Sequence, residues 1–546
     1  MKRAHRHLAE QIRKALTDLG IAEPRIILEK PRDPEHGDIA TNAAMVYCKQ
    51  LKLAPRKLAE QLTKRLALNP ELIRLAGVAG PGFINFRFAD AYLQTLVRQI
   101  LDSDEHFGEG KDLAGKKVLI EFVSANPSGP LNVVSARAAA VGDCLVRMFR
   151  ARGATCHSEF YVNDAGNQVK LLGDSVRARY ETLLGNEIEI PEGGYHGEYI
   201  VEFAKQLVDD EGDKYSKLSA EDASNTLGLL AVERHVSMQR NSLERFRVNM
   251  DGWFRESQLR ESRAEYAALE ELKQKGTLYE NDGATFLRTS EFGDTQDWVV
   301  ITSEGRPTYF LPDIAYHLSK FKRGYDIIID ILGPDHHSYL TKMAAAMRAL
   351  GRDAEQLEII LLQHITLSRS GEPVKMSKRA GQMIEMDELL DEVGCDAARY
   401  FFLLRRTTTQ LDFDIELAKK QSDDNPVFYV QYAHARIQSI FRKAEIELKP
   451  EKADFSLLNH PEELILLRRL REFEEVISDC VVNRDPHAMT VWLREVAAQF
   501  HRFYHHCRVI TEPEELSLAR LALCRATQTG LKRGLSLCGV NAPEEM

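Results

Sequence analysis

The feature that most constrains the fold of this 546-residue chain is a strand, a loop, a helix and a second strand between residues 118 and 162. The apolar runs 118–123 and 158–162 predict buried strands, and the intervening helix is predicted to end at Gly153. Two neighbouring strands joined through a helix are expected to be parallel. Ligands bind at the carboxyl ends of such strands, which here is the loop 124–135.

Patterns on either side of this unit predict three domains. Residues 1–110 mix helical and strand-like segments, as expected of a small α+β domain. Residues 111–410 continue the α/β pattern around a charged, helical insertion at about 183–300. Beyond the insertion, 325–332 and 357–367 read as strands. Residues 411–546 are predicted to form an all-helical bundle.

The composition excludes several classes of protein. No run approaches the roughly 20 apolar residues of a membrane-spanning helix. The eight cysteines form no CxxC pair, so neither a zinc knuckle nor a disulfide framework is indicated. The amino terminus lacks the apolar core of a signal peptide, which favours a cytoplasmic location. The net charge of −10 argues against a basic DNA-coating protein but does not exclude a local basic face that binds nucleic acid.

Residues 121–131, EFVSANPSGPL, join the first strand to the helix. A helix amino terminus presents free N–H groups that suit phosphate. A carboxylate at Glu121, near the end of a buried strand, needs a cation partner. On local evidence alone, a surface turn whose Asn and Ser cap the helix is the simpler interpretation. No GxGxxG follows the strand, which disfavours a dinucleotide site.

Later segments carry weaker signals. The run 375–381, KMSKRAG, has three cations within five residues and suits a loop that grips polyphosphate, although a lone charge run is more often a solvated turn. Asp313 is equally consistent with a helix-start carboxylate, and Asp335 and His336 with a polar helix start. The histidines near residue 505 lack a partner pair at metal spacing, so no metal site is expected.

The order of these motifs resembles that of class I aminoacyl-tRNA synthetases. EFVSANPSGPLNVVSARAAAVGD and, far downstream, VKMSKRAG are similar to their HIGH and KMSKS signatures. More narrowly, DPEHGDIATNAAM, GVAGPGFINFRF, YVNDAGNQ, NPVFYVQYAHARI, FHRFYHHCRVI and the ending GVNAPEEM resemble segments of bacterial-type arginyl-tRNA synthetase. The resemblance covers essentially the whole chain. It implies a multidomain α/β protein: a Rossmann-like catalytic domain with a parallel sheet, a small α+β domain that binds tRNA and a helical anticodon-binding bundle.

The resemblance implies ATP-dependent attachment of L-arginine to its cognate tRNA through arginyl-adenylate, with release of pyrophosphate and AMP. ATP would bind with Mg²⁺ held through phosphates and water, and a monomer is expected. The substrate guanidinium would be held by Glu121 and Asp313 with Tyr309 alongside, and the α-amino end by Ser124 and Asn126.

The remaining implied roles concern ATP and tRNA. The HIGH-like motif would comprise Ala125, Asn126, Pro127, Ser128, Gly129, Pro130, Leu131, Asn132, Val133, Val134 and Ser135. Catalysis would fall to Asn132, Ser135, Lys375 and Lys378. ATP would contact Gly129, Pro130, Leu131, Val134, Asp335, His336, Met376, Ser377 and Lys378. Candidate tRNA contacts are Tyr429, Tyr432 and Arg436, since aromatic rings stack on unpaired bases and Arg pairs with phosphate.

One departure from the family pattern keeps alternatives open. Where the family has His-x-Gly-His, this chain has Asn132-Val133-Val134-Ser135. Asn and Ser can donate hydrogen bonds to phosphate but add no positive charge. The KMSK run and the candidate guanidinium carboxylates are retained, which favours an active enzyme. A non-catalytic tRNA-binding protein, or a class I synthetase of different specificity, is the alternative.

Overall fold

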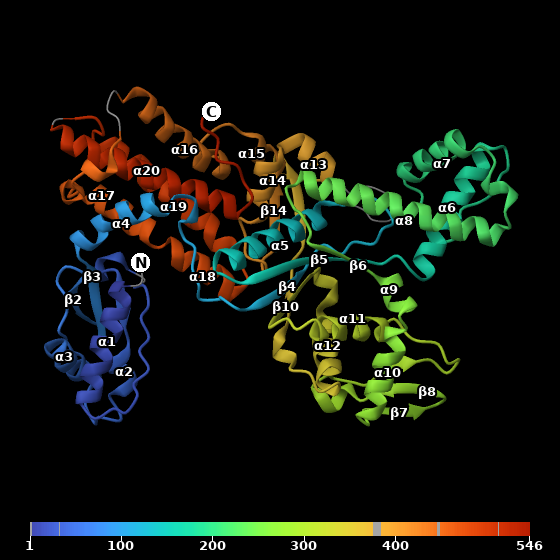
Figure 1. Ribbon diagram of the computed structural model, residues 1–546, viewed down its shortest axis with the longest axis horizontal. Helices are drawn as coiled ribbons and strands as arrows, with labels where there is room; N and C mark the ends of the chain where they lie inside the picture. The colour runs from blue at the N-terminus through green and yellow to red at the C-terminus, as the bar shows by residue number, and fades with distance from the viewer. Residues whose placement is uncertain (1–2, 32, 375–383, 445–447, 512) are drawn as a thin grey trace.

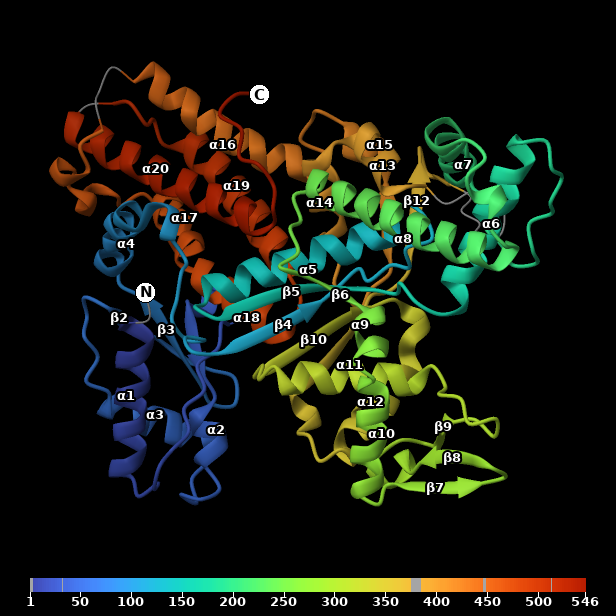
Figure 2. The same ribbon diagram turned by 45° about the vertical axis from the view of Figure 1, so that its right-hand side comes forward.

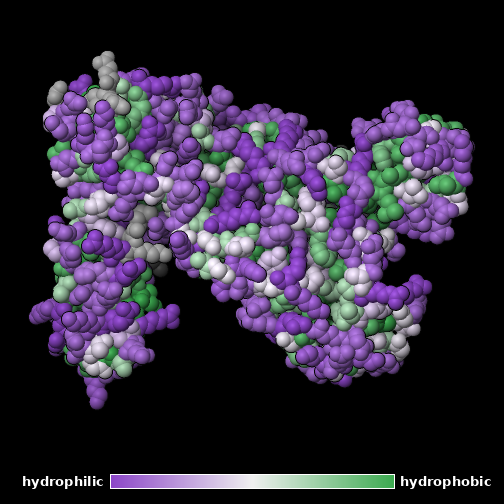
Figure 3. Space-filling view, viewed as in Figure 1, coloured by the Kyte–Doolittle hydropathy of each residue, from purple (hydrophilic) through white to green (hydrophobic). Residues whose placement is uncertain are grey.

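The computed structural model describes residues 3–31, 33–374, 384–444, 448–511 and 513–546 (Figure 1). An amino-terminal domain, a central α/β domain and a carboxy-terminal helical domain are evident, as predicted. In the space-filling view of Figure 3 the amino-terminal domain stands apart from the lower part of the central domain, and the visible face is mostly hydrophilic. Among the described helices, none is both long and apolar enough to span a membrane.

The amino-terminal domain packs helices on a small antiparallel sheet of order β1-β3-β2. Helix α1 buries one stripe of its surface, which includes Leu8, Ile12 and Leu16 at helical spacing. The elements are α1 (Arg3–Asp18), β1 (Ile39–Thr41), α2 (Ala43–Tyr47), α3 (Pro55–Arg65), β2 (Ile73–Ala79), β3 (Phe83–Phe88) and the following α4 (Asp90–Ser103).

The central domain is built on a five-stranded sheet of order β11-β10-β4-β5-β6, parallel throughout. Its strands are β4 (Lys117–Glu121), β5 (Thr155–Val162), β6 (Gly252–Arg255), β10 (Ile327–Leu332) and β11 (Leu357–Leu361). Helices α5 (Val133–Ala151) and α11 (Phe310–Lys322) cover opposite faces of the sheet (Figure 2). Alternation along β4 explains this, because Ile120 packs in the cluster containing α5 and Leu119 in the cluster containing α11.

The segment 183–300 differs from the helical insertion expected. Helices α6 (Asn167–Leu183), α7 (Glu198–Glu211) and α8 (Ala220–Arg245) form a projecting arm. Beyond Arg245, however, β6 completes the parallel sheet, α9 (Glu256–Glu261) and α10 (Ala264–Gln274) follow, and β7 (Leu278–Asn281), β8 (Ala284–Leu287) and β9 (Trp298–Ile301) make an antiparallel sheet. These strands are four residues long, too short for apolar alternation to stand out among charged residues.

The single strand expected at 357–367 is two strands. After β11 the chain leaves the parallel sheet, and β12 (Ile365–Arg369) pairs with β13 (Glu372–Pro373) and β14 (Leu411–Asp414) in a separate sheet. The polar pair Gln363-His364 interrupts the apolar run at this change of sheet. Hydrophobic pattern reports burial but not which sheet a strand joins. Helix α12 (His337–Ala349) connects β10 to β11, and α13 (Met386–Val393) and α14 (Cys395–Phe402) lie between β13 and β14.

The carboxy-terminal domain is helical, as predicted. Its helices are α15 (Ile415–Lys419), α16 (Pro426–Lys443), α17 (Pro461–Arg471), α18 (Phe473–Asn483), α19 (His487–His506) and α20 (Glu514–Leu537). Helix α17 begins with residues that are typical of a helix start. Pro461 is its first residue, and His460 and Glu463 form a capping box.

Candidate active site

A cavity of about 270 Å³ opens at the carboxyl ends of β4 and β10, where the sheet topology predicts a ligand. Its wall brings together six of the residues singled out from sequence: Glu121, Ser124, Val134, Ser135, Asp313 and His336. It also includes Tyr161, Tyr316, His317, Asp330 and Tyr339.

Three buried carboxylates cross the sheet at one level beside this cavity. Glu121 of β4 is in register with Asp330 of β10 on one side and with Glu159 of β5 on the other. Their exposed fractions are 7, 2 and 2%. We call Glu121, Asp330 and Glu159 the carboxylate row. Buried carboxylates are costly unless paired with cations.

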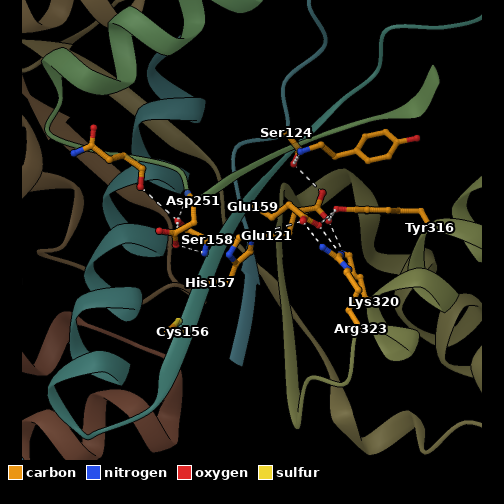
Figure 4. Close-up of polar contacts among 12 residues, drawn as sticks. Glu121, Ser124, Cys156, His157, Ser158, Glu159, Asp251, Tyr316, Lys320 and Arg323 are labelled. Atoms are coloured by element: carbon orange, nitrogen blue, oxygen red, sulfur yellow. Dashed lines mark hydrogen bonds and ion pairs between the residues drawn. The ribbon is translucent and has the colours of Figure 1, made fainter. Parts of the chain in front are cut away.

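Helix α11 and the residue after it supply those cations. Lys320 Nζ lies 2.5 Å from Glu121 Oε2 and 2.7 Å from Asp330 Oδ1. The Arg323 guanidinium donates to both oxygens of Glu159, at 2.5 and 2.8 Å (Figure 4). Burial alone would lower the pKa of Lys320, but the charges of Asp330 and Glu121 raise it above its ordinary value. For Asp330 the effect of burial is the opposite, because burial alone would raise its pKa. The nearby Lys320 and then His317 lower the pKa of Asp330 to about 2. Two cations, one from α11 and one from the residue after it, thus face the three carboxylates of the row.

Tyr316 strengthens this attachment. Its hydroxyl lies 2.8 Å from Glu121 Oε2 and 2.9 Å from Glu159 Oε1, so it bridges two strands (Figure 4). Tyr316, Lys320 and Arg323 recur at helical spacing and project from the face of α11 that covers the sheet.

Asp313, in the first turn of α11, differs from the carboxylate row. The structure gives its carboxylate no ion pair with any described residue, although it lines the cavity. Burial raises the pKa of Asp313 to about 6, and the negative charges of Glu256 and Glu121 act in the same direction against His317 and Lys342. A cation entering the cavity would relieve this cost.

Glu256 is a candidate site residue that sequence reasoning missed. It is 8% exposed, follows β6 directly and hydrogen-bonds to Tyr161, which lines the cavity. Its Oε1 also accepts hydrogen bonds from Arg260. The signal was the same one that singled out Glu121, a carboxylate at the end of a buried strand. It was overlooked because β6 was not recognised as a strand.

The turn after β4 is strained. Val123 and Ser124 both adopt left-handed backbone conformations, with φ of 73° and 39°. Such conformations are costly for a β-branched residue and cluster at functional sites. The Ser124 hydroxyl donates to Glu121 Oε1 at 2.8 Å and accepts from the Tyr161 N–H at 3.0 Å. These two bonds hold the turn against neighbouring strands.

The amino terminus of α5 carries the replaced signature. Asn132 Oδ1 accepts the N–H groups of Val134 at 2.9 Å and Ser135 at 3.2 Å, so it caps the helix. The residue that caps α5 is thus Asn132, which lies just outside the 121–131 segment whose Asn and Ser were considered as caps. Val134, 39% exposed, and Ser135 line the cavity from the same turn.

Several predicted residues lie away from the cavity wall. Tyr309 precedes α11 and is 77% exposed. Of the other described candidates for arginine, ATP and the HIGH-like motif, those outside the wall are Ala125, Asn126, Pro127, Ser128, Gly129, Pro130, Leu131, Asn132, Val133 and Asp335. Lys375, Met376, Ser377 and Lys378 lie outside the described residues.

The three tRNA candidates meet in a second cavity, of about 440 Å³, between α16 and α19. Tyr429, Tyr432 and Arg436 line it, together with His501 and Tyr504. The Arg436 guanidinium lies 4.6 Å from the centroid of the Tyr504 ring and 5.8 Å from that of Tyr432. Such a cluster of aromatic rings and a cation suits unpaired nucleic-acid bases and phosphate.

Comparisons with known proteins agree with this architecture. Residues 6–88 match the family model described as the arginyl tRNA synthetase N terminal domain, 96–408 the class I (R) tRNA synthetase catalytic domain and 430–546 the DALR anticodon binding domain. Arginine–tRNA ligase of Listeria monocytogenes serotype 4b (strain F2365) is 45% identical over 99% of this chain and 98% of its own length, and that of Carboxydothermus hydrogenoformans is 43% identical over 100 and 99%.

Solved structures give the same picture. A putative arginyl-tRNA synthetase from Campylobacter jejuni is similar with a TM-score of 0.78 and 36% identity, covering 84% of this chain and all of its own. The arginyl-tRNA synthetase of Thermus thermophilus shares the fold with a TM-score of 0.79 over 99% of this chain and all of its own, at 23% identity. From its three matching domains and its full-length relatives, this chain belongs to the arginyl-tRNA synthetase family.

Proposed function

We propose that this enzyme attaches L-arginine to its cognate tRNA. Arginine and ATP, bound as its Mg²⁺ complex, form arginyl-adenylate and pyrophosphate. The arginyl group then passes to the terminal adenosine of the tRNA with release of AMP. No covalent enzyme intermediate is needed, so catalysis rests on positioning and on stabilising phosphate charge.

The observation that carries the proposal is the partly buried Asp313 carboxylate, which has no ion pair among the described residues and lines the cavity. A guanidinium offers planar, paired donors to a carboxylate and stays charged at all relevant pH values. We assign the guanidinium to Asp313, with the charge of Glu256 nearby.

The role that we propose for Glu121 differs from the one expected from the sequence. Its carboxylate is already paired with Lys320 and bonded to Ser124 and Tyr316. A second cation would therefore gain less from Glu121 than from Asp313. We propose that Glu121 chiefly fixes the Ser124 turn, and that Ser124 and Asn126 face the α-amino end of arginine. Tyr309, exposed at the start of α11, would contact arginine only after moving toward the cavity.

The ATP side of the cavity would be the turn that begins α5. Val134, Ser135 and His336 line it, and we propose that they contact ATP together with Gly129, Pro130, Leu131 and Asp335. Asn132 would contribute chiefly by capping α5. Lys375, Met376, Ser377 and Lys378 are proposed to grip the triphosphate, on the strength of the sequence motif alone. The cluster Tyr429, Tyr432 and Arg436 would contact the anticodon arm. A monomer in the cytoplasm completes the proposal.

Arginine-dependent ATP–pyrophosphate exchange, measured with and without tRNA, tests the function. Exchange that requires arginine supports the proposal. Tight tRNA binding without exchange or aminoacylation would favour the non-catalytic alternative that the Asn132–Ser135 replacement raises. Charging of another amino acid in preference to arginine would show a different specificity.

A further inference from the structure

We propose that helix α8 holds the 126–129 turn of the HIGH-like motif in place relative to α13, and that His235 and Gln239 are its positioning residues. This inference rests on the proposed function. Helix α8 runs from the projecting arm of α6 and α7 to α13 (Figure 1).

The first contact is with the turn 126–129 of the HIGH-like motif. Gln239 Nε2 donates to the carbonyl oxygens of Asn126 at 3.0 Å and Gly129 at 2.9 Å. His235 Nδ1 lies 3.0 Å from the carbonyl oxygen of Pro127. Both side chains are completely buried. Two residues one helical turn apart thus hold three carbonyl groups of one short turn.

The protonation state of His235 follows from its surroundings. Burial lowers the pKa of His235 to about 4, against the opposing effect of the Pro127 carbonyl. The imidazole is therefore neutral at pH 7. Because a carbonyl only accepts hydrogen bonds, the proton is on Nδ1 and is donated to Pro127. The bond to the turn thus persists through the physiological pH range.

Within the described part of the chain, the buried side chains of His235 and Gln239 hydrogen-bond only to the turn 126–129. Among the described residues, His235 Nε2 and Gln239 Oε1 are buried and have no hydrogen-bond partner. Leaving a buried polar atom unpaired is unfavourable. Apolar residues at positions 235 and 239 would avoid this cost. The polar side chains are therefore explained by what they donate to the turn and not by the packing of α8 itself.

The turn has few donors of its own. Pro127 and Pro130 have no N–H group, so this segment depends on outside donors to satisfy its carbonyls. The arm makes a third contact here, because a Cβ atom on Gly129 would lie 2.9 Å from the ring of Tyr199 in α7. The glycine thus allows the arm to approach the motif closely.

The second contact of α8 lies further along the same face. Ser242 Oγ hydrogen-bonds to Asp387 in the first turn of α13, and Arg245 pairs with Asp387 at 3.0 Å. Helix α13 begins three residues after the segment 375–383, which contains the KMSK motif. Positions 235, 239, 242 and 245 recur at helical spacing, so one face of α8 meets both the 126–129 turn and α13.

The two segments also touch directly. The Met386 N–H of α13 donates to the Leu131 carbonyl at 2.8 Å. Helix α8 contacts both parts of this junction, through Gln239 at the turn and through Ser242 at α13. A displacement of the 126–129 turn relative to α13 would shift the start of α5, where we place ATP, and errors of about 1 Å are enough to cost catalysis roughly 100-fold.

The test uses the full-length enzyme in ATP–pyrophosphate exchange with tRNA and arginine. Gln239→Met keeps the shape and removes the donors. His235→Leu removes the donor, whereas His235→Asn keeps an N–H near the position of Nδ1. Gln206→Met is the matched control, because Gln206 is exposed on α7 and bonds to Arg234 of α8 without touching the turn.

We expect Gln239→Met and His235→Leu to lower kcat/KM for ATP by about 10- to 100-fold and to raise KM for arginine by less, because the guanidinium site proposed at Asp313 lies outside the turn. His235→Asn should remain within about threefold of the wild type. The proposal is overturned if both variants match Gln206→Met, if the KM values for ATP and arginine rise equally, or if His235→Asn is as impaired as His235→Leu. Should Gln239→Met fail to fold by circular dichroism, the two His235 variants decide. Exchange by the wild type reports separately on the proposed function.

Discussion

The pH dependence of arginine binding tests the role of Asp313 most directly. Its pKa of about 6 means that the carboxylate loses its charge as the pH falls through 6, where an ordinary aspartate would keep it. If the ionised form binds the guanidinium, affinity is complete at pH 8 and declines on acidification. At pH 5, one unit below the pKa, about one enzyme molecule in eleven is ionised. The apparent Kd should therefore rise about tenfold between pH 8 and pH 5.

Isothermal titration calorimetry of arginine against the tRNA-free enzyme measures this profile. Asp313→Asn should weaken binding at pH 8 by about 30-fold or more, because a buried charge pair is lost, and should flatten the profile. Asp209→Asn, at an exposed position of α7, is the control. An affinity that is constant from pH 8 to pH 5, or a slope that survives in Asp313→Asn, would refute the reasoning.

Three further outcomes are expected. Lys320→Met removes the cation of the carboxylate row and should destabilise the fold by about 3–5 kcal/mol, seen as a lower melting temperature that the exposed Lys322→Met on the same helix does not share; equal melting temperatures would contradict the role of the row. Arg436→Ala should raise KM for tRNA by about fivefold or more with little change in KM for arginine, and parallel changes in both would argue against a tRNA contact. Lys378→Ala, in the segment outside the described residues, should slow exchange by roughly tenfold or more at unchanged arginine affinity, and an unaltered rate would exclude its assigned role.

Sequence patterns predicted the features that are local in the chain. The strand–helix–strand unit, the helical carboxy-terminal domain and the cavity position all follow from apolar periodicity and from the rule for parallel sheets. The four-residue strand β6 was too short to be predicted from apolar periodicity. Glu256, which follows it, was therefore not predicted as a site residue.

The partners of buried charges were also beyond local patterns. The sequence indicated that Glu121 needs a cation. In the structure this cation is Lys320, which lies 199 residues away in the chain. The same applies to His235 and Gln239, whose bonds to the turn 126–129 join segments more than 100 residues apart. Which distant side chain meets which is decided by packing, and a single sequence carries no direct record of it.

The common attachment of Asp313 and Lys320 to α11 bears on altering which amino acid the enzyme accepts. Tyr316 and Lys320, which hold the carboxylate row, lie in the middle and last turns of the helix, and Asp313, the carboxylate proposed to select arginine, lies in the first. Side chains at the entrance can therefore be exchanged while the contacts of Tyr316 and Lys320 keep the scaffold intact. Grafting this helix into another synthetase would require the three matching acids on three adjacent strands as well, since otherwise a buried ammonium group would be left without a counter-ion.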